Sequence, residues 1–150
     1  MDKEKALEKL KELKTNFNEE VAKLEKIINQ PETLFEKVTT YEAVCKYLKE
    51  KQLTLKDYNF IATTKGRKRA LAFGKFEQIQ RLFNGDWETK FDGKQENWYP
   101  YFTLGSGGVL GFCSSGYCYD CYVGQIGYFK DRETSDFVGK TFIDIYREIY

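Results

Sequence analysis

The turn signal Asn84-Gly85-Asp86 divides this sequence into two parts with different patterns. Before it, charged residues alternate with apolar residues at helical spacing; after it, short aromatic segments are separated by glycine and serine. Most of the 11 tyrosines lie after Trp98, among residues that favour a pleated surface. We therefore predict an α+β fold: a long N-terminal helix, two further helices, and a small antiparallel β-meander of three to four strands covered by a C-terminal helix.

A chain of 150 residues is suited to one compact domain with an appendage. We expect the appendage over residues 1–30 and a single α+β domain over residues 31–150. Within that domain, residues 38–84 are expected to be helical, and residues 86–150 to form the aromatic sheet and the last helix.

The segment from Asp2 to Asn29 lacks Gly and Pro and has apolar residues at the three-four spacing of a heptad seam, with Lys14 in the vacant place. This predicts a helix that ends before Pro31. The helix either self-associates as a coiled coil, giving a homo-oligomer, or lies along the rest of the domain. The seam consists of Leu7, Leu10, Phe17, Val21, Leu24 and Ile28.

Further helices are expected over residues 38–50, where Thr39 and Glu42 are spaced as a capping box, and over residues 67–83. The last helix is expected to be capped by Thr134 or Ser135 and to cover one face of the sheet. Strands are predicted over residues 97–104, 109–115, 117–124 and 126–129, with Pro100 at an edge or an irregularity.

The stretch "CSSGYCYDC" places Cys113, Cys118 and Cys121 within nine residues, which raises the question of a metal or redox site. A structural zinc site needs four ligands, and the chain has no histidine. In a strand Cys118 and Cys121 would point to opposite faces. We therefore predict a strand and its preceding turn, with Cys45 a small buried residue on a helix.

No constellation of catalytic groups is present, since the absence of histidine excludes Ser-His and Cys-His pairs. "GSGG" at residues 105–108 is followed by apolar residues, which favours a hairpin turn over a phosphate loop. We expect a protein that is not an enzyme and needs no cofactor.

One basic cluster could contact phosphate, although a net charge of +1 gives no global attraction to nucleic acid. With aromatic side chains at residues 98–102, it makes nucleic-acid or nucleotide binding an alternative function; otherwise it is a solvated helix end. The cluster consists of Lys65, Arg67, Lys68, Arg69 and Lys75. No apolar run is long enough to cross a bilayer and no signal peptide is evident, so we expect no membrane association and reduced thiols.

The segments "WYPYF" at residues 98–102 and "YFKDRETSDFVGKTFIDIY" at residues 128–146 resemble a family of small uncharacterised proteins from bacteriophages and prophages of gut Bacteroidales. The resemblance covers residues 38–150. It implies a viral or mobile-element source, a soluble domain without a catalytic residue, and a location in the cytoplasm of an infected or lysogenic bacterium, or alternatively in the virion. In that family the tyrosine-rich region has no fixed cysteine set, which further disfavours a metal site.

Taken together, these features predict a non-catalytic accessory protein that binds a protein partner, such as a host defence component. Binding is expected through an aromatic sheet face, the N-terminal helix, or both. Besides nucleic-acid binding, a virion or assembly component that oligomerises through residues 2–29 is an alternative. The partner-binding candidates are Trp98, Tyr99, Tyr101, Tyr117, Tyr119 and Tyr122.

Overall fold

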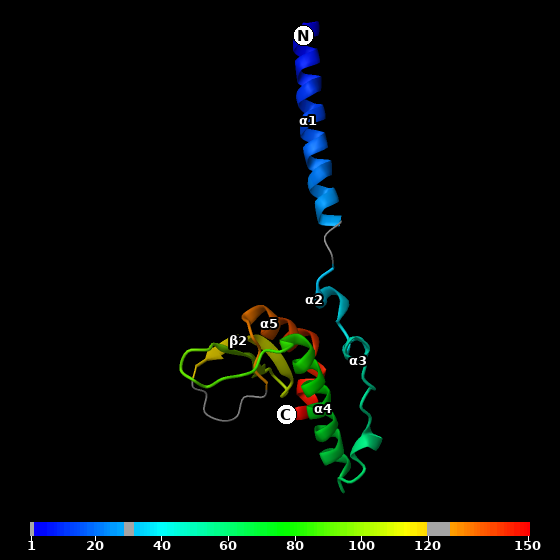
Figure 1. The fold of residues 1–150 in the computed structure, drawn as a ribbon, viewed down its shortest axis with the longest axis vertical. Helices are drawn as coiled ribbons and strands as arrows, with labels where there is room; N and C mark the ends of the chain where they lie inside the picture. Colours follow the sequence, from blue (N-terminus) through cyan, green and yellow to red (C-terminus); the bar gives the residue numbers. More distant parts are fainter. Residues whose placement is uncertain (1, 29–31, 120–126) are drawn as a thin grey trace. The chain divides into compact units, whose positions relative to one another are not determined.

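The computed structural model describes residues 2–28, 32–119 and 127–150, and it divides the chain into two compact units, Met1–Thr33 and Leu34–Tyr150 (Figure 1). The second unit is α+β, as predicted. It contains α2 (Leu34–Lys37), α3 (Tyr41–Leu48), the 3-10 helix η1 (Leu55–Tyr58), α4 (Thr64–Asn84), β1 (Asn97–Leu104), β2 (Leu110–Cys118), α5 (Arg132–Thr141) and α6 (Ile143–Ile149).

The first unit is the helix α1 (Lys3–Ile28), which confirms the long N-terminal helix. The apolar residues of its seam are largely in contact with solvent: Phe17 is 69% exposed, and Leu7, Leu10 and Leu24 are each about half exposed. Leu13, which the heptad pattern did not include, is exposed as well. Pro31, predicted to end this helix, lies outside the described residues.

The helices α3 and α4 occupy the expected parts of the chain. The N-terminus of α3 is capped by Thr40, whose hydroxyl accepts a hydrogen bond of 3.2 Å from the Ala43 N–H. The prediction of Thr39 as the cap was therefore wrong by one residue, because both threonines precede the same apolar run. Thr63 caps α4 in the same way, with the Gly66 N–H as donor at 3.1 Å.

The strands β1 and β2 form an antiparallel hairpin whose register pairs Trp98 with Tyr117 and Phe102 with Phe112. Its turn has Gly107 at φ 94° and Gly108 at φ 74°, which confirms the hairpin turn predicted at "GSGG". The predicted meander of three to four strands is not confirmed. The described residues form two strands and one isolated bridge, between Trp98 and Phe129, and the expected strand over residues 117–124 continues into 120–126, outside them.

Pro100 lies inside β1 without disrupting the ladder. The N–H and C=O of Trp98 both bond to Phe129, so at that residue the backbone polar groups point away from β2. Two residues later, Pro100 has the same orientation, and its missing N–H is on the outer side. The register also shifts between Tyr101 and Phe102, an irregularity of the kind predicted near this proline.

The C-terminal segment forms two helices rather than the single helix predicted, because the chain leaves helical geometry at Phe142, with φ −108° and ψ 27°. Asp131 caps α5 by accepting a 2.7 Å hydrogen bond from the Thr134 N–H. The predicted caps, Thr134 and Ser135, are instead buried within the first turn of the helix.

As predicted, α5 covers one face of the hairpin, and α6 packs beside α4 (Figure 1). Gly139 of α5 allows this contact, since a Cβ there would lie 2.6 Å from the Phe112 ring and 2.7 Å from Pro100 Cβ. The core lies between these helices and the sheet, and each fully buried Val, Ile or Phe stabilises it by about 1.5–3 kcal/mol. Its buried residues are Val38, Val44, Ala72, Phe76, Ile79, Phe83, Phe129, Val138, Phe142, Tyr146 and Ile149.

Candidate functional site

The end of the hairpin farthest from its turn carries a group of aromatic side chains around one carboxylate. We call this group, Glu96, Trp98, Tyr117 and Tyr119, the aromatic hairpin end. Trp98 lies opposite Tyr117 in the register. Glu96 directly precedes β1 and Tyr119 directly follows β2. The contacts of their side chains with Trp98 and Tyr117 place all four on one side of the hairpin.

The contacts within the aromatic hairpin end converge on Glu96. Trp98 Nε1 donates a hydrogen bond of 3.2 Å to Glu96 Oε2, and Tyr119 Oη donates one of 3.2 Å to Glu96 Oε1. The ring centroids of Trp98 and Tyr117 are 4.9 Å apart, and those of Tyr117 and Tyr119 are 5.6 Å apart with an edge-to-face geometry. Tyr117 is 49% exposed and Tyr119 39% exposed, so the rings are accessible from solvent.

Two other predicted aromatic residues, Tyr99 and Tyr101, lie on the opposite face of the hairpin. The rings of Tyr99 and Tyr101 are 5.6 Å apart, and Tyr99 also contacts Tyr128, at 6.0 Å. Burial, followed by the neighbouring Tyr101, raises the pKa of Tyr99. The six predicted residues therefore do not form one surface, and Tyr122 lies outside the described residues.

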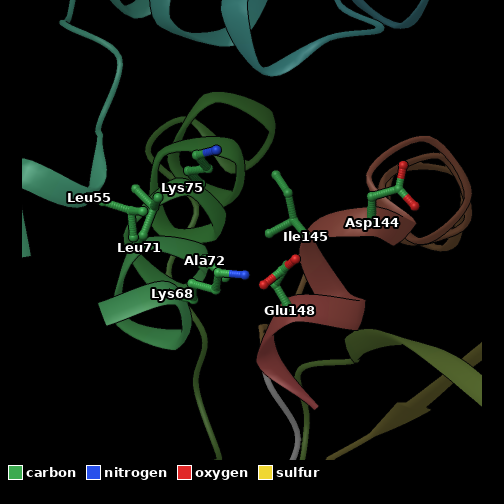
Figure 2. A pocket seen from close by; sticks show the side chains of 8 residues that line it. All are labelled: Leu55, Lys68, Leu71, Ala72, Lys75, Asp144, Ile145 and Glu148. Atoms are coloured by element: carbon green, nitrogen blue, oxygen red, sulfur yellow. The ribbon is translucent and has the colours of Figure 1, made fainter. Parts of the chain in front are cut away.

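A second candidate site is a cavity of about 320 Å³ between α4, α6 and η1 (Figure 2). Lys68 and Lys75 on α4 form one wall, while Asp144 and Glu148 on α6 form the opposite wall. The remaining lining residues are apolar: Leu55, Leu71, Ala72 and Ile145. Asp144 is paired with Arg147 at 2.7 Å, but Glu148 has no ion pair within the described residues.

Two residues of the predicted phosphate-binding cluster, Lys68 and Lys75, line this cavity. Lys68 and Lys75 are seven residues apart and so share one face of α4. Asp144 and Glu148 line the same cavity, and their negative charges would repel the phosphate groups of a nucleic acid. Lys65 and Arg69 are exposed, whereas Arg67 is partly buried and its Nε has no hydrogen-bond partner in the described structure.

A polar network that sequence reasoning did not predict joins α3 and the residues after it to α4. Buried Gln78 accepts a hydrogen bond from the Tyr41 hydroxyl and donates one of 2.8 Å to Glu50. Arg81 holds Glu50 with two bonds of 2.5 and 2.9 Å, and this contact lowers the pKa of Glu50 to about 2. Burial raises the pKa of Tyr41 above its usual range, so its hydroxyl stays protonated and unsuited to act as a base. The network therefore holds α3 and the residues after it against α4.

The cysteines do not assemble into a site within the described residues. Cys45 is buried on α3, as predicted, and Cys113 is exposed at the register shift in β2, where it has no opposite residue. Cys118 is disulfide-bonded, so the expectation of reduced thiols was wrong at this residue. Cys121 lies outside the described part of the chain. Within the described residues, no three potential metal ligands lie close enough together to hold an ion.

Two further predictions concern α1 and membranes. The predicted oligomerisation residues Leu7, Leu10, Phe17 and Leu24 are exposed, Val21 is half-buried, and the side chain of Ile28 lies outside the described residues. Over the parts of the chain that the structure describes, every helix is too short or too polar to span a lipid bilayer.

Glu96 is the residue of this candidate site that sequence reasoning missed. The available signal was the spacing: Glu96 is two residues before Trp98, and Tyr119 is two residues after Tyr117. Recognising the group required the register, which only the folded chain supplies. Comparison with known proteins adds no assignment, since no protein-family model, curated protein or solved structure matches this chain.

Proposed function

We propose that this protein is a non-catalytic binding protein that recognises a protein partner through the aromatic hairpin end. The observation that carries the proposal is the exposure of Tyr117 and Tyr119 beside the partly buried Trp98 ring, at an end of the hairpin where the described residues leave these rings accessible. Tyr and Trp supply large contact areas with few rotatable bonds and are enriched among residues that dominate binding energy. In the phage or prophage setting that the sequence resemblance implies, the partner would be a host component such as a defence protein.

The proposal is supported by the contacts that position the group within the chain itself. Trp98 is fixed by the Phe129 bridge through its backbone and by Glu96 through its indole N–H. Tyr119 is fixed by the same carboxylate. A preorganised surface loses less conformational entropy on binding than a mobile one.

The test uses a tagged full-length chain to isolate partners from bacterial lysate, followed by affinity measurement with the purified partner. The double variant Trp98→Ala, Tyr117→Ala is expected to weaken binding by about 30-fold if one ring dominates the contact and by about 700-fold if both contribute, since residues of this type typically contribute about 2 kcal/mol each. Tyr47→Ala is the matched control, because Tyr47 is an exposed aromatic residue on α3. Equal affinity of the double variant and the control for the purified partner would refute this binding surface.

A second candidate function is self-assembly through α1, favoured by the exposed stripe of Leu7, Leu10 and Phe17. An isolated helix of this composition has little stability of its own in water, and covering the stripe would stabilise it. In this proposal the helix joins two copies of the chain, and the aromatic hairpin end remains available to the partner.

A further inference from the structure

The Glu96 carboxylate has a negative charge that nothing in the described structure neutralises. Its two hydrogen bonds come from the indole N–H of Trp98 and the hydroxyl of Tyr119, both of which are uncharged donors. Within the described residues, Glu96 forms no ion pair with a lysine or arginine. The site is therefore an exposed carboxylate flanked by three aromatic side chains.

The arrangement of donors leaves a defined set of acceptor sites on this carboxylate. Each carboxylate oxygen has about two lone-pair positions. Trp98 occupies one position on Oε2 and Tyr119 occupies one on Oε1. One position remains on each oxygen, so the carboxylate keeps two acceptor positions for the N–H groups of a guanidinium.

The aromatic rings favour the same ligand. The faces of Trp and Tyr rings attract cations, and Trp is the strongest of the three aromatic side chains. The planar guanidinium can stack on such rings while it donates hydrogen bonds in its plane, and it is less strongly hydrated than an ammonium. A lysine could supply the charge but neither the stacking plane nor the paired donors.

We propose that the aromatic hairpin end binds an arginine side chain of the partner, stacked on the Trp98 and Tyr117 rings and bonded to the Glu96 carboxylate. This inference rests on the proposed function, because it assumes that the partner is a protein, and it names the side chain that the partner must present. It also predicts that the partner surface is basic at this point.

The experiment titrates the full-length chain with N-acetylarginine N-methylamide and follows the two tryptophan indole N–H signals by NMR, with Trp98→Phe to assign them. We expect a saturable shift of the Trp98 signal in the millimolar range, with the Trp87 signal unchanged as an internal control. The corresponding citrulline compound has nearly the same shape without the charge and is expected to leave Trp98 unchanged. The lysine compound is expected to bind more weakly than arginine.

Two variants connect the shift to the proposed contacts. Glu96→Gln keeps the shape of an exposed side chain and removes the charge, so arginine affinity is expected to fall about tenfold. Glu42→Gln, which removes an exposed carboxylate from α3, is expected to bind like the wild type. Equal shifts with arginine and citrulline, no shift of the Trp98 signal, or unchanged affinity in Glu96→Gln would each overturn the inference.

The outcomes separate this inference from the proposed function. If arginine fails to bind while the Trp98→Ala, Tyr117→Ala variant still loses its partner, the surface is a protein-binding site and the arginine assignment is wrong. If arginine binds but the partner's affinity is unaffected by that variant, the cation site stands and the proposed function is wrong.

Discussion

A steric contact between Gly74 of α4 and Tyr58 of η1 allows a sharp test of the packing. A Cβ atom at residue 74 would overlap the Tyr58 hydroxyl oxygen, and it would lie 2.8 Å from Leu53 Cδ1 and 3.3 Å from Tyr58 Cζ. The hydroxyl itself has no hydrogen-bond partner among the described residues. Glycine at this position therefore serves the close approach of η1 to α4, at the expense of helix propensity.

The competing effects can be weighed for Gly74→Ala. Alanine in a helix interior is favoured over glycine by about 1 kcal/mol, whereas inserting an atom into filled space costs about 1–3 kcal/mol. The clash involves an oxygen on a rigid ring, so we expect the variant to lower the free energy of unfolding by about 1 kcal/mol. In a Tyr58→Phe background the overlapping atom is absent, and the nearest remaining atom is the end of a flexible leucine side chain. There the same substitution is expected to raise the free energy of unfolding by about 0.5–1 kcal/mol.

The assay is urea unfolding of the wild type, both single variants and the double variant, followed by far-ultraviolet circular dichroism. The expected coupling between the two substitutions is about 1.5–2 kcal/mol, well above the roughly 0.5 kcal/mol within which independent sites add. Additive effects, or a destabilisation by Gly74→Ala that persists without the hydroxyl, would refute the close approach of η1 to α4.

Three other outcomes are expected. Tyr146→Phe should raise the free energy of unfolding by up to about 1 kcal/mol in thermal melts, because the Tyr146 hydroxyl is buried without a hydrogen-bond partner in the described structure; a loss of stability would mean that the hydroxyl is bonded. Arg81 lowers the folded-state pKa of Glu50 to about 2, so the stabilisation from this carboxylate is present above its unfolded pKa of about 4.3 and is lost as the pH falls through about 2. Glu50→Gln should therefore flatten the decline in unfolding free energy over that interval, and an unchanged slope would contradict the contact. In a parallel α1 dimer Lys14 would face the same lysine of the second copy, whereas in an antiparallel dimer it would lie against Phe17. Light scattering should therefore show a dimer that Phe17→Glu dissociates and that Lys14→Leu strengthens.

The parts of the fold that could be predicted from the sequence are those specified by neighbouring residues. α1 and α4 follow from apolar spacing and from local stop signals such as Gly85, which adopts φ 57° at the end of α4. The hairpin turn follows from the run of glycines. Caps were misassigned by one to four residues, because Thr39 and Thr40, or Asp131 and Ser135, are equivalent by type and differ only in which N–H they reach in the folded chain.

The parts that could not be predicted depend on residues far apart in the sequence. The last helix ends at Phe142 and resumes directly after it, which places Phe142 and Tyr146 in a core shared with Phe76 and Phe83 of α4. Nothing in the local periodicity requires that break. The aromatic candidates could be listed from composition, but the division of those in β1 and β2 between two faces depends on the register.

The start of α5 determines how much of the sheet face stays open. Phe129 is bridged to Trp98, and two residues later Asp131 caps the helix, so the chain turns back beside the aromatic hairpin end. From there α5 runs over the hairpin toward its turn: Ser135 bonds to Ser115 at 2.7 Å, and one helical turn later Gly139 packs on Pro100 and Phe112. Asp131 therefore both stabilises α5 by capping it and sets the point, two residues after the Phe129 bridge, at which the helix begins to cover the sheet.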